Sequence, residues 1–216
     1  MRNIGCLVVL AVLAVIAWFF RDDIRARLGR DRTSAAAPTT GVVWEPLTPA
    51  GAARARRSVA GLGGRSGPVF TNMRPGEVSS YVFEELSKGV LPPSAQNAEA
   101  AVIGDQLAIR ALINLADFGG KQSVGPIAAM LGDREPVQFG GTIEVIRPGL
   151  AQYRVKAIKI RDLSLPPPMI PRILKNIERG PRQAGVAPDG LPLVIPEYIG
   201  DVRISNGKVT LYKAVR

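Results

Sequence analysis

Residues 137–160 read VQFGGTIEVIRPGLAQYRVKAIKI, and this stretch decides the fold. Val137, Phe139, Ile143 and Val145 recur at every second or fourth position, with polar residues between most of them. A period of two is typical of a β-strand that buries one face. The tripeptide Arg147-Pro148-Gly149 interrupts the alternation with residues that favour a turn. The stretch therefore predicts two long antiparallel strands joined by a turn.

The second of these strands changes phase along its length. Tyr153 and Val155 are apolar with polar neighbours, but Ile158 and Ile160 form the apolar set farther on. One extra residue on one strand, a β-bulge, keeps both sets on the same face of a sheet. The sequence therefore predicts a bulge or a sharp bend near Ala157 and Ile158.

Further strands are predicted on both sides of this stretch. Residues 98–103 and 107–116 alternate around Gly104-Asp105, which predicts a hairpin. Residues 202–204 and 209–211 alternate around Asn206-Gly207, and Asn-Gly is the preferred type I′ turn. Val69–Met73 is a candidate short strand, and residues 191–195 are a short apolar run.

Three segments are predicted to be helices. Thr48 as N-cap and Pro49 at the first position start one that ends near Gly63 and Gly64. Glu77–Lys88 and Ile170–Arg179 each place apolar residues on one face. The predicted fold class is α+β: an N-terminal transmembrane helix followed by a curved antiparallel sheet packed against two or three amphipathic helices.

An uncharged apolar segment, Ile4–Phe20, opens the chain. At ~1.5 Å per residue its 17 residues span about 25 Å as a helix, the short end of what crosses a bilayer. Trp18, Phe19 and Phe20 end it, where aromatic rings favour the membrane interface. A cleaved signal peptide is the alternative, but Trp-Phe-Phe-Arg-Asp-Asp is a poor cleavage site. The single cysteine, Cys6, is interpreted as a lipid-facing residue, with acylation as the alternative.

Positive charge is concentrated next to this segment. The chain carries a net charge of +10, and residues 21–74 contribute +6 through ten arginines and four acids. Arginine beside an apolar helix interacts with anionic headgroups, at about 1 kcal/mol each. The predicted partner is therefore an anionic bilayer, and nucleic-acid binding is not expected. The candidate membrane-surface residues are Arg21, Arg25, Arg27, Arg30, Arg32, Arg54 and Arg57.

The predicted organisation has three parts. Residues 1–20 are the anchor, 21–43 an arginine-rich juxtamembrane segment and linker, and 44–216 a single α+β domain. Within that domain, 44–76 is a basic helix and loop and 77–216 a sheet-rich core. The predicted location is the cell (inner) membrane, which the chain crosses once. The positive-inside rule places the domain in the cytoplasm, whereas a short N-terminal anchor commonly exports the domain after it, so these two signals disagree about the side of the membrane.

The sequence offers little for catalysis. The chain has no histidine, so the commonest general base and metal ligand are absent. One cysteine cannot form a thiolate metal cluster. Asp133 and Glu135 are interpreted as a solvated turn, and the glycine-rich residues 61–67 as a helix C-terminus and loop. We therefore predict no enzyme, no cofactor and no metal.

Apolar surface is the remaining candidate for a functional site. The two amphipathic helices either close one face of the sheet as an ordinary core or leave a channel for an acyl chain. If a channel exists, its candidate ligand-binding residues are Val82, Leu86, Ile170, Ile173, Leu174 and Ile177.

From Glu77 onward the chain resembles a family of uncharacterised bacterial single-pass membrane-anchored proteins related to tubular lipid-binding (TULIP-like) domains. The resemblance rests on the order of four segments: VSSYVFEELSKGVL, AEAAVIGDQLAIRALINL, the strand pair from Val137 with the helix after it, and YIGDVRISNGKVTLYK. It covers about two thirds of the chain. It implies a curved sheet that holds lipid against a helix, usually outside the cytoplasmic membrane. Because of this resemblance we favour the extracytoplasmic side for the domain.

These observations lead to two hypotheses. The first is a non-catalytic, membrane-anchored binding module that holds a lipid or another apolar ligand at the membrane surface. The second is a structural accessory subunit that stabilises a larger membrane complex of the respiratory or photosynthetic type.

Overall fold

The computed structural model describes residues 41–86, 94–118, 131–177 and 183–215. Residues 42–216 form one compact unit, and its described part is mostly antiparallel sheet with a few helices, so the α+β prediction holds. In these ranges no helix is both long enough and apolar enough to cross a bilayer. The predicted anchor Ile4–Phe20 lies outside them.

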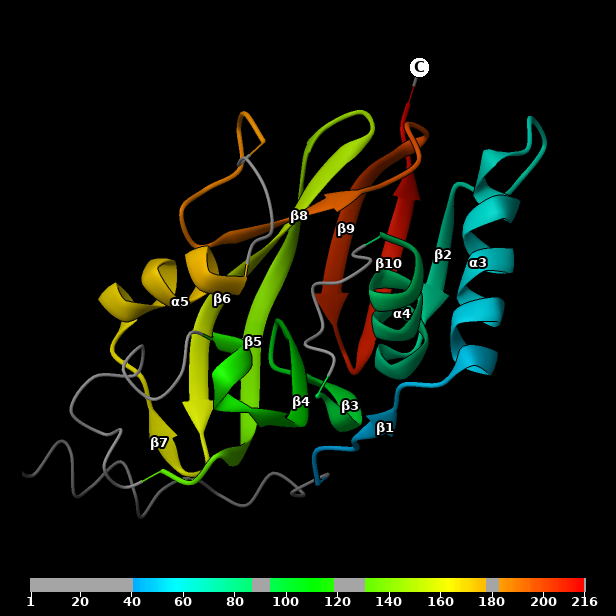
Figure 1. Ribbon diagram of the computed structural model, residues 1–216. Coiled ribbons are helices and arrows are strands. Elements are labelled where there is room, and N and C mark those ends of the chain that lie inside the picture. The colour runs from blue at the N-terminus through cyan, green and yellow to red at the C-terminus, as the bar shows by residue number, and fades with distance from the viewer. Residues whose placement is uncertain (1–40, 87–93, 119–130, 178–182, 216) are drawn as a thin grey trace, which may run out of the picture. The chain divides into compact units, whose positions relative to one another are not determined.

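The larger sheet has seven strands and is open (Figure 1). β5 (Arg134–Arg147) and β6 (Leu150–Ile160) form its long central pair, as the alternation predicts. β4 (Gln106–Asn114) pairs with β5, β3 (Gln96–Ile103) with β4, and the short β1 (Glu45–Pro46) with β3. The hairpin predicted around Gly104 and Asp105 is confirmed, with strand bounds that differ by a few residues.

Two short strands share the outer edge of β6. β8 (Gly190–Val194) pairs with its first half, and β7 (Leu163–Ser164) pairs with its last two residues. Between these pairings, Val155 N donates to Asp189 O at 2.8 Å and Leu165 N donates to Ile158 O at 2.9 Å. The edge of β6 is therefore covered by two separate segments of chain, and the candidate site lies where they part.

The predicted bulge is present in β6. Val155 stands opposite Gly141 and Ala157 opposite Gly140, so Lys156 is an extra residue without a partner position on β5. As a result Val155 and Ile158 are both buried, while Lys156 and Ala157 between them are exposed. The change of apolar phase in the sequence is thus accommodated by the backbone.

A second sheet of three strands was not predicted. β2 (Phe70–Met73) pairs with β10 (Lys208–Lys213), which pairs with β9 (Ile199–Ser205). The β9–β10 turn has φ of 51° at Asn206 and 73° at Gly207, as a type I′ turn requires. One face of this sheet adds Met73, Val209 and Leu211 to the core.

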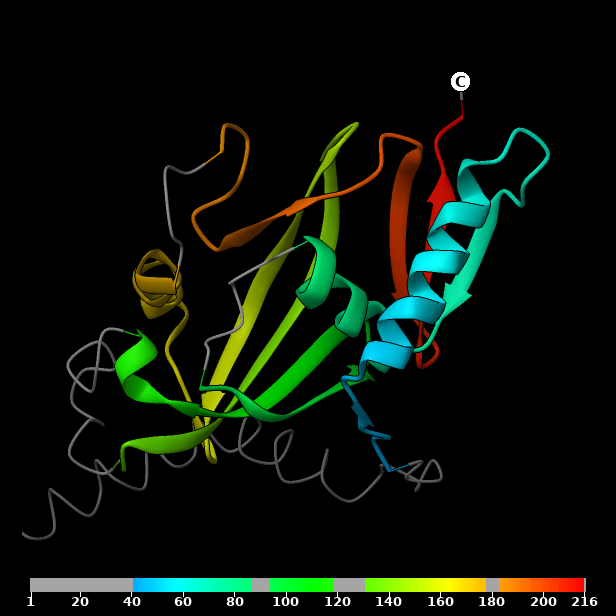
Figure 2. The ribbon, with the colours of Figure 1, turned by 45° about the vertical axis from the view of Figure 1, so that its right-hand side comes forward.

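Helices α3 (Pro49–Gly63) and α4 (Pro75–Tyr81) pack on each other, and Figure 1 and Figure 2 both show them beside β2 and β10. Thr48 is the N-cap of α3, because its Oγ1 accepts a hydrogen bond from Gly51 N at 3.0 Å. The predicted stripe of α3 is buried and consists of Ala52, Ala55, Val59 and Leu62. α4 begins two residues before the predicted Glu77 and continues as a π-helical turn, η1 (Val82–Leu86).

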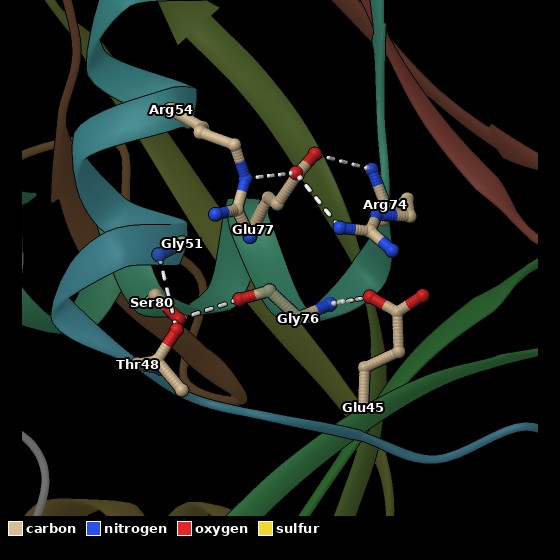
Figure 3. Close-up of polar contacts among 8 residues, drawn as sticks. All are labelled: Glu45, Thr48, Gly51, Arg54, Arg74, Gly76, Glu77 and Ser80. Carbon is tan, nitrogen blue, oxygen red and sulfur yellow. Dashed lines mark hydrogen bonds and ion pairs between the residues drawn. The ribbon is translucent and has the colours of Figure 1, made fainter.

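Hydroxyl and carboxylate groups fasten α3 and α4 to β1 (Figure 3). Ser80 Oγ donates to Gly76 O at 2.6 Å and accepts from Thr48 N at 2.9 Å. Glu45 Oε2 accepts from Gly76 N at 3.1 Å. A Cβ on Gly76 would lie 2.7 Å from Glu45 Cβ, so only glycine permits this approach.

The last helix, α5 (Ile170–Ile177), follows a 3₁₀ turn, η4 (Pro167–Met169), and packs against β6, β8 and the 3₁₀ turn η2 (Leu115–Phe118). It agrees with the predicted helix over its described length. In both views α5 lies at one side of the long strands and α3 with α4 at the other (Figure 1, Figure 2).

Candidate functional site

A groove of about 440 Å³ lies where the edge of β6 meets the start of α5 and the segment before β8. We call it the Ile170 groove. Its apolar wall consists of Val155, Pro167, Ile170, Pro171 and Pro188. Three charged residues, Arg154, Lys156 and Asp189, also line it. Pockets that hold small molecules typically have volumes of about 300–1,000 Å³, and the volume of the Ile170 groove lies in this range. The groove is open to solvent, and among its apolar residues Pro167 and Pro188 are exposed whereas Val155 and Ile170 are buried.

One side of the groove is fixed by polar contacts to β6. Arg154 Nε donates to Asp189 Oδ2 at 3.1 Å, and Ala187 N donates to Gln152 Oε1 at 2.8 Å. Gln152 is itself buried and donates from Nε2 to Glu144 Oε2 at 3.0 Å. These contacts hold residues 187–189 against the strand, so this side of the groove is a positioned wall.

Arg154 is also close to a second carboxylate. Its Nη1 lies 3.7 Å from Glu144 Oε2. The hydrogen bond to Asp189 and the negative charge of that residue raise the pKa of the Arg154 guanidinium, and the charge of Glu144 adds to this effect. Arg154 therefore stays charged, and its charge is balanced from within the protein.

The other side of the groove depends on the packing of α5. Ile173 and Leu174 are buried at 3% and 0% exposure, which seats the helix on the sheet. A small hollow of about 10 Å³ remains beneath it, lined only by apolar side chains, among them Ile173, Val137 and Leu165. That volume suits about one water molecule, and its apolar lining offers a water no hydrogen bond. The floor under α5 is therefore close to filled.

The six predicted ligand-binding residues do not share one site in the structure. Ile170 lines the groove and Ile173 lines the hollow, whereas Val82 and Leu174 are buried and line neither of the two. The side chains of Leu86 and Ile177 lie outside the described part of the chain. Ile170 is thus the member of the set that the structure places at a groove of ligand size.

Sequence reasoning missed the charged residues of the groove. Arg154 and Asp189 are 35 residues apart, and nothing local in either segment predicts their contact. The sequence did contain a signal close to Lys156: the apolar alternation of β6 changes phase beside this residue, and that change marks the bulge. The run Leu165-Pro166-Pro167-Pro168 indicates the approach to a helix, but nothing in it predicts the wall of a groove.

The prediction for Glu135 was wrong. This residue is not in a solvated turn, because its side chain is 1% exposed and belongs to β5. Arg161 Nε donates to Glu135 Oε2 at 2.5 Å, and Gly132 N donates to Oε1 at 2.5 Å. Arg161 has a φ of 55°, the left-handed conformation of the β6–β7 turn. The carboxylate therefore joins the turn to the start of β5, a structural role.

Of the candidate membrane-surface arginines, the described ones are Arg54 and Arg57. Arg54 Nε donates to Glu77 Oε1 at 2.7 Å, and Arg74 contributes a further contact at 3.3 Å (Figure 3). Burial alone would raise the pKa of Glu77, but the hydrogen bonds from Arg54 and Arg74 outweigh it, and the pKa lies below its ordinary value. Arg57 is exposed. The predicted residues Arg21, Arg25, Arg27, Arg30, Arg32, Trp18, Phe19 and Phe20 lie outside the described ranges.

Over residues 41–86, 94–118, 131–177 and 183–215 no three histidine, cysteine, aspartate or glutamate side chains gather as they would around a metal ion. No family model, no curated protein and no solved structure matches the chain. Its function is therefore inferred from the groove and from the sequence.

Proposed function

We propose that this protein is a non-catalytic binding module, tethered to a membrane by Ile4–Phe20, that holds a lipid or another apolar ligand in the Ile170 groove. The observation that carries the proposal is the groove itself: about 440 Å³ with five apolar residues along its wall. A ligand that covers this wall gains about 25 cal/mol for each Å² of apolar surface removed from water.

The geometry favours binding at the edge of β6 over binding beneath α5. The hollow under the helix is too small for an acyl chain at about 10 Å³. Three prolines line the groove. Two of them, Pro167 and Pro188, are exposed, so a ligand can reach them. Proline side chains are apolar and lose little conformational entropy when covered, so the wall is preorganised.

The non-catalytic part of the proposal rests on the side chains present. The chain has no histidine, and the carboxylate that lines the groove, Asp189, is held by Arg154. The Arg154–Asp189 ion pair is suited to a structural role, in which it holds the segment before β8 at the wall of the groove.

A second candidate function is the accessory subunit, and one observation favours it. The outer face of the second sheet carries Phe70 at 48% exposure beside Tyr212, at 6.0 Å between ring centroids. The Arg203 guanidinium lies over the Tyr212 ring at 4.9 Å. Tyrosine, phenylalanine and arginine are enriched at protein interfaces, so this face is where we place a partner subunit in the second candidate function.

The test is purification of the full chain in mild detergent, followed by mass spectrometry of the lipids and proteins that elute with it. We expect a stoichiometric lipid that is retained by the wild type and by Pro168→Phe, and is lost by at least several-fold from Pro171→Phe. Pro168 lies in η4 and Pro171 is the second residue of α5, and of the two only Pro171 lines the groove. Equal lipid content in the two variants would reject the groove as the binding site. A stoichiometric protein without lipid would favour the accessory subunit.

A further inference from the structure

Two cationic side chains, Arg154 and Lys156, line the Ile170 groove, and within the part of the chain that the structure describes only the first of them has carboxylate partners. Asp189 and Glu144 both contact Arg154. Lys156, two residues farther along β6, is exposed, lines the groove and has no ion pair with a described carboxylate. One positive charge therefore faces the groove without a described partner, next to an apolar wall.

The position of Lys156 follows from the bulge. Since Lys156 is the extra residue of β6, the strand buries Val155 before it and Ile158 after it, and leaves Lys156 on the groove side. Bulges re-aim side chains and recur beside functional sites. Gly141 on β5 accommodates the bulge, because a Cβ at this position would lie 2.2 Å from Arg154 O. The backbone conformation at the bulge therefore places the Lys156 side chain at the groove.

A ligand that covers the apolar wall also displaces water from around Lys156. A neutral ligand would leave the ammonium partly desolvated without compensation, which is unfavourable. A ligand with a negative group would form a charge-assisted hydrogen bond to Lys156 Nζ, among the stronger kinds. The groove therefore distinguishes ligands by the charge at one end as well as by their apolar part.

We propose that the ligand is an anionic amphipath, in which an apolar chain lies along Pro167, Ile170, Pro171 and Pro188 and a carboxylate or phosphate group pairs with Lys156 Nζ. This inference rests on the proposed function, because it names the class of ligand for the same groove. Arg154 does not serve as the first anion partner, because Asp189 occupies it.

The experiment uses the full chain in nanodiscs of neutral lipid and photoreactive probes that share one alkyl chain. The probes are a fatty acid, its methyl ester and the corresponding alkyl phosphate. Each is titrated and cross-linked, and the cross-links are mapped by peptide mass spectrometry. Free inorganic phosphate is added as a competitor, to separate binding of an anion alone from binding of an amphipath.

We expect cross-links at residues 167–171 and 188, with half-saturation for the acid and the phosphate roughly tenfold below that for the ester, as for a hydrogen bond to a charged group. Lys156→Met removes this preference and keeps ester binding, whereas Lys156→Arg retains the preference. Lys208→Met is the matched control on the second sheet and leaves the preference unchanged. Inorganic phosphate competes weakly.

The outcomes separate the two proposals. If acid and ester cross-link equally well in the wild type and in Lys156→Met, the groove binds apolar ligands and the anionic class is wrong. If inorganic phosphate abolishes probe binding at low concentration, the site recognises the anion alone and the amphipath is wrong. If no probe cross-links at the groove at all, the proposed function itself fails.

Discussion

The substitution Gly141→Ala tests how closely β5 and β6 approach each other at the bulge. A Cβ at this position would lie 2.2 Å from Arg154 O and 3.1 Å from Tyr153 Cζ. The carbonyl oxygen belongs to the backbone of the neighbouring strand, so it cannot rotate away as a side chain would. Relief requires β5 and β6 to move apart next to the buried Tyr153, whose OH donates to Leu107 O at 2.7 Å.

The size of the effect follows from this geometry. Extra methyl groups in a packed region typically cost about 1–3 kcal/mol, and a backbone contact belongs at the upper end. We expect Gly141→Ala to lower the free energy of unfolding by about 3 kcal/mol. For a unit of this size that corresponds to a fall in Tm of roughly 6–12 °C.

Gly140→Ala is the matched control, because the same change one residue earlier meets a different environment. Its Cβ would lie 3.0 Å from Gln106 Oε1, the end of a flexible side chain, and 3.9 Å from Ala157 Cβ. We expect a change in stability within about 1 kcal/mol. Thermal unfolding of both variants followed by circular dichroism measures the difference. Equal Tm values for the two variants would refute the close approach of the strands at Gly141.

Three further predictions concern stability. Leu174→Ala removes a side chain with 0% exposure and should lower the free energy of unfolding by about 2–5 kcal/mol in urea titrations, enough to loosen α5. Tyr153→Phe removes the donor to Leu107 O and should cost about 1–2 kcal/mol by the same measurement; no change would show that the carbonyl is satisfied otherwise. The folded-state pKa of Glu77 lies below its ordinary value of 4.5, so the stability from its ionised form is present above that value and lost as the pH falls through the folded-state pKa. Glu77→Gln should therefore be less stable than wild type at pH 7, and this difference should shrink in unfolding curves recorded towards pH 3.

Local signals in the sequence account for much of the fold. The Thr48-Pro49 start of α3, the Asn206-Gly207 turn and the bulge near Ala157 each depend on neighbouring residues, and the structure confirms all three. The pairing of β2 with β10 has no such signal. It joins residues as distant as Asn72 and Thr210, and short strands choose their partners through packing that one sequence does not display.

The candidate site was predictable only in part, for the same reason. Ile170 was predicted from the apolar face of its helix, and that face is what seats α5. The charged lining depends on where loops meet a strand edge: Asp189 contacts β6 because β8 joins the same edge. Lys156 follows from the bulge, but its exposure to a groove depends on the prolines of η4 and on Pro188, which the fold brings to it.

Ligand binding in the Ile170 groove would be tested most directly by an experimental structure of the full chain, purified in mild detergent together with the lipids that it retains. We expect elongated density in the groove, along Pro171 and Pro188, with its polar end near Lys156. An empty groove in a preparation that contains a stoichiometric lipid, or lipid density at another surface, would contradict the proposal.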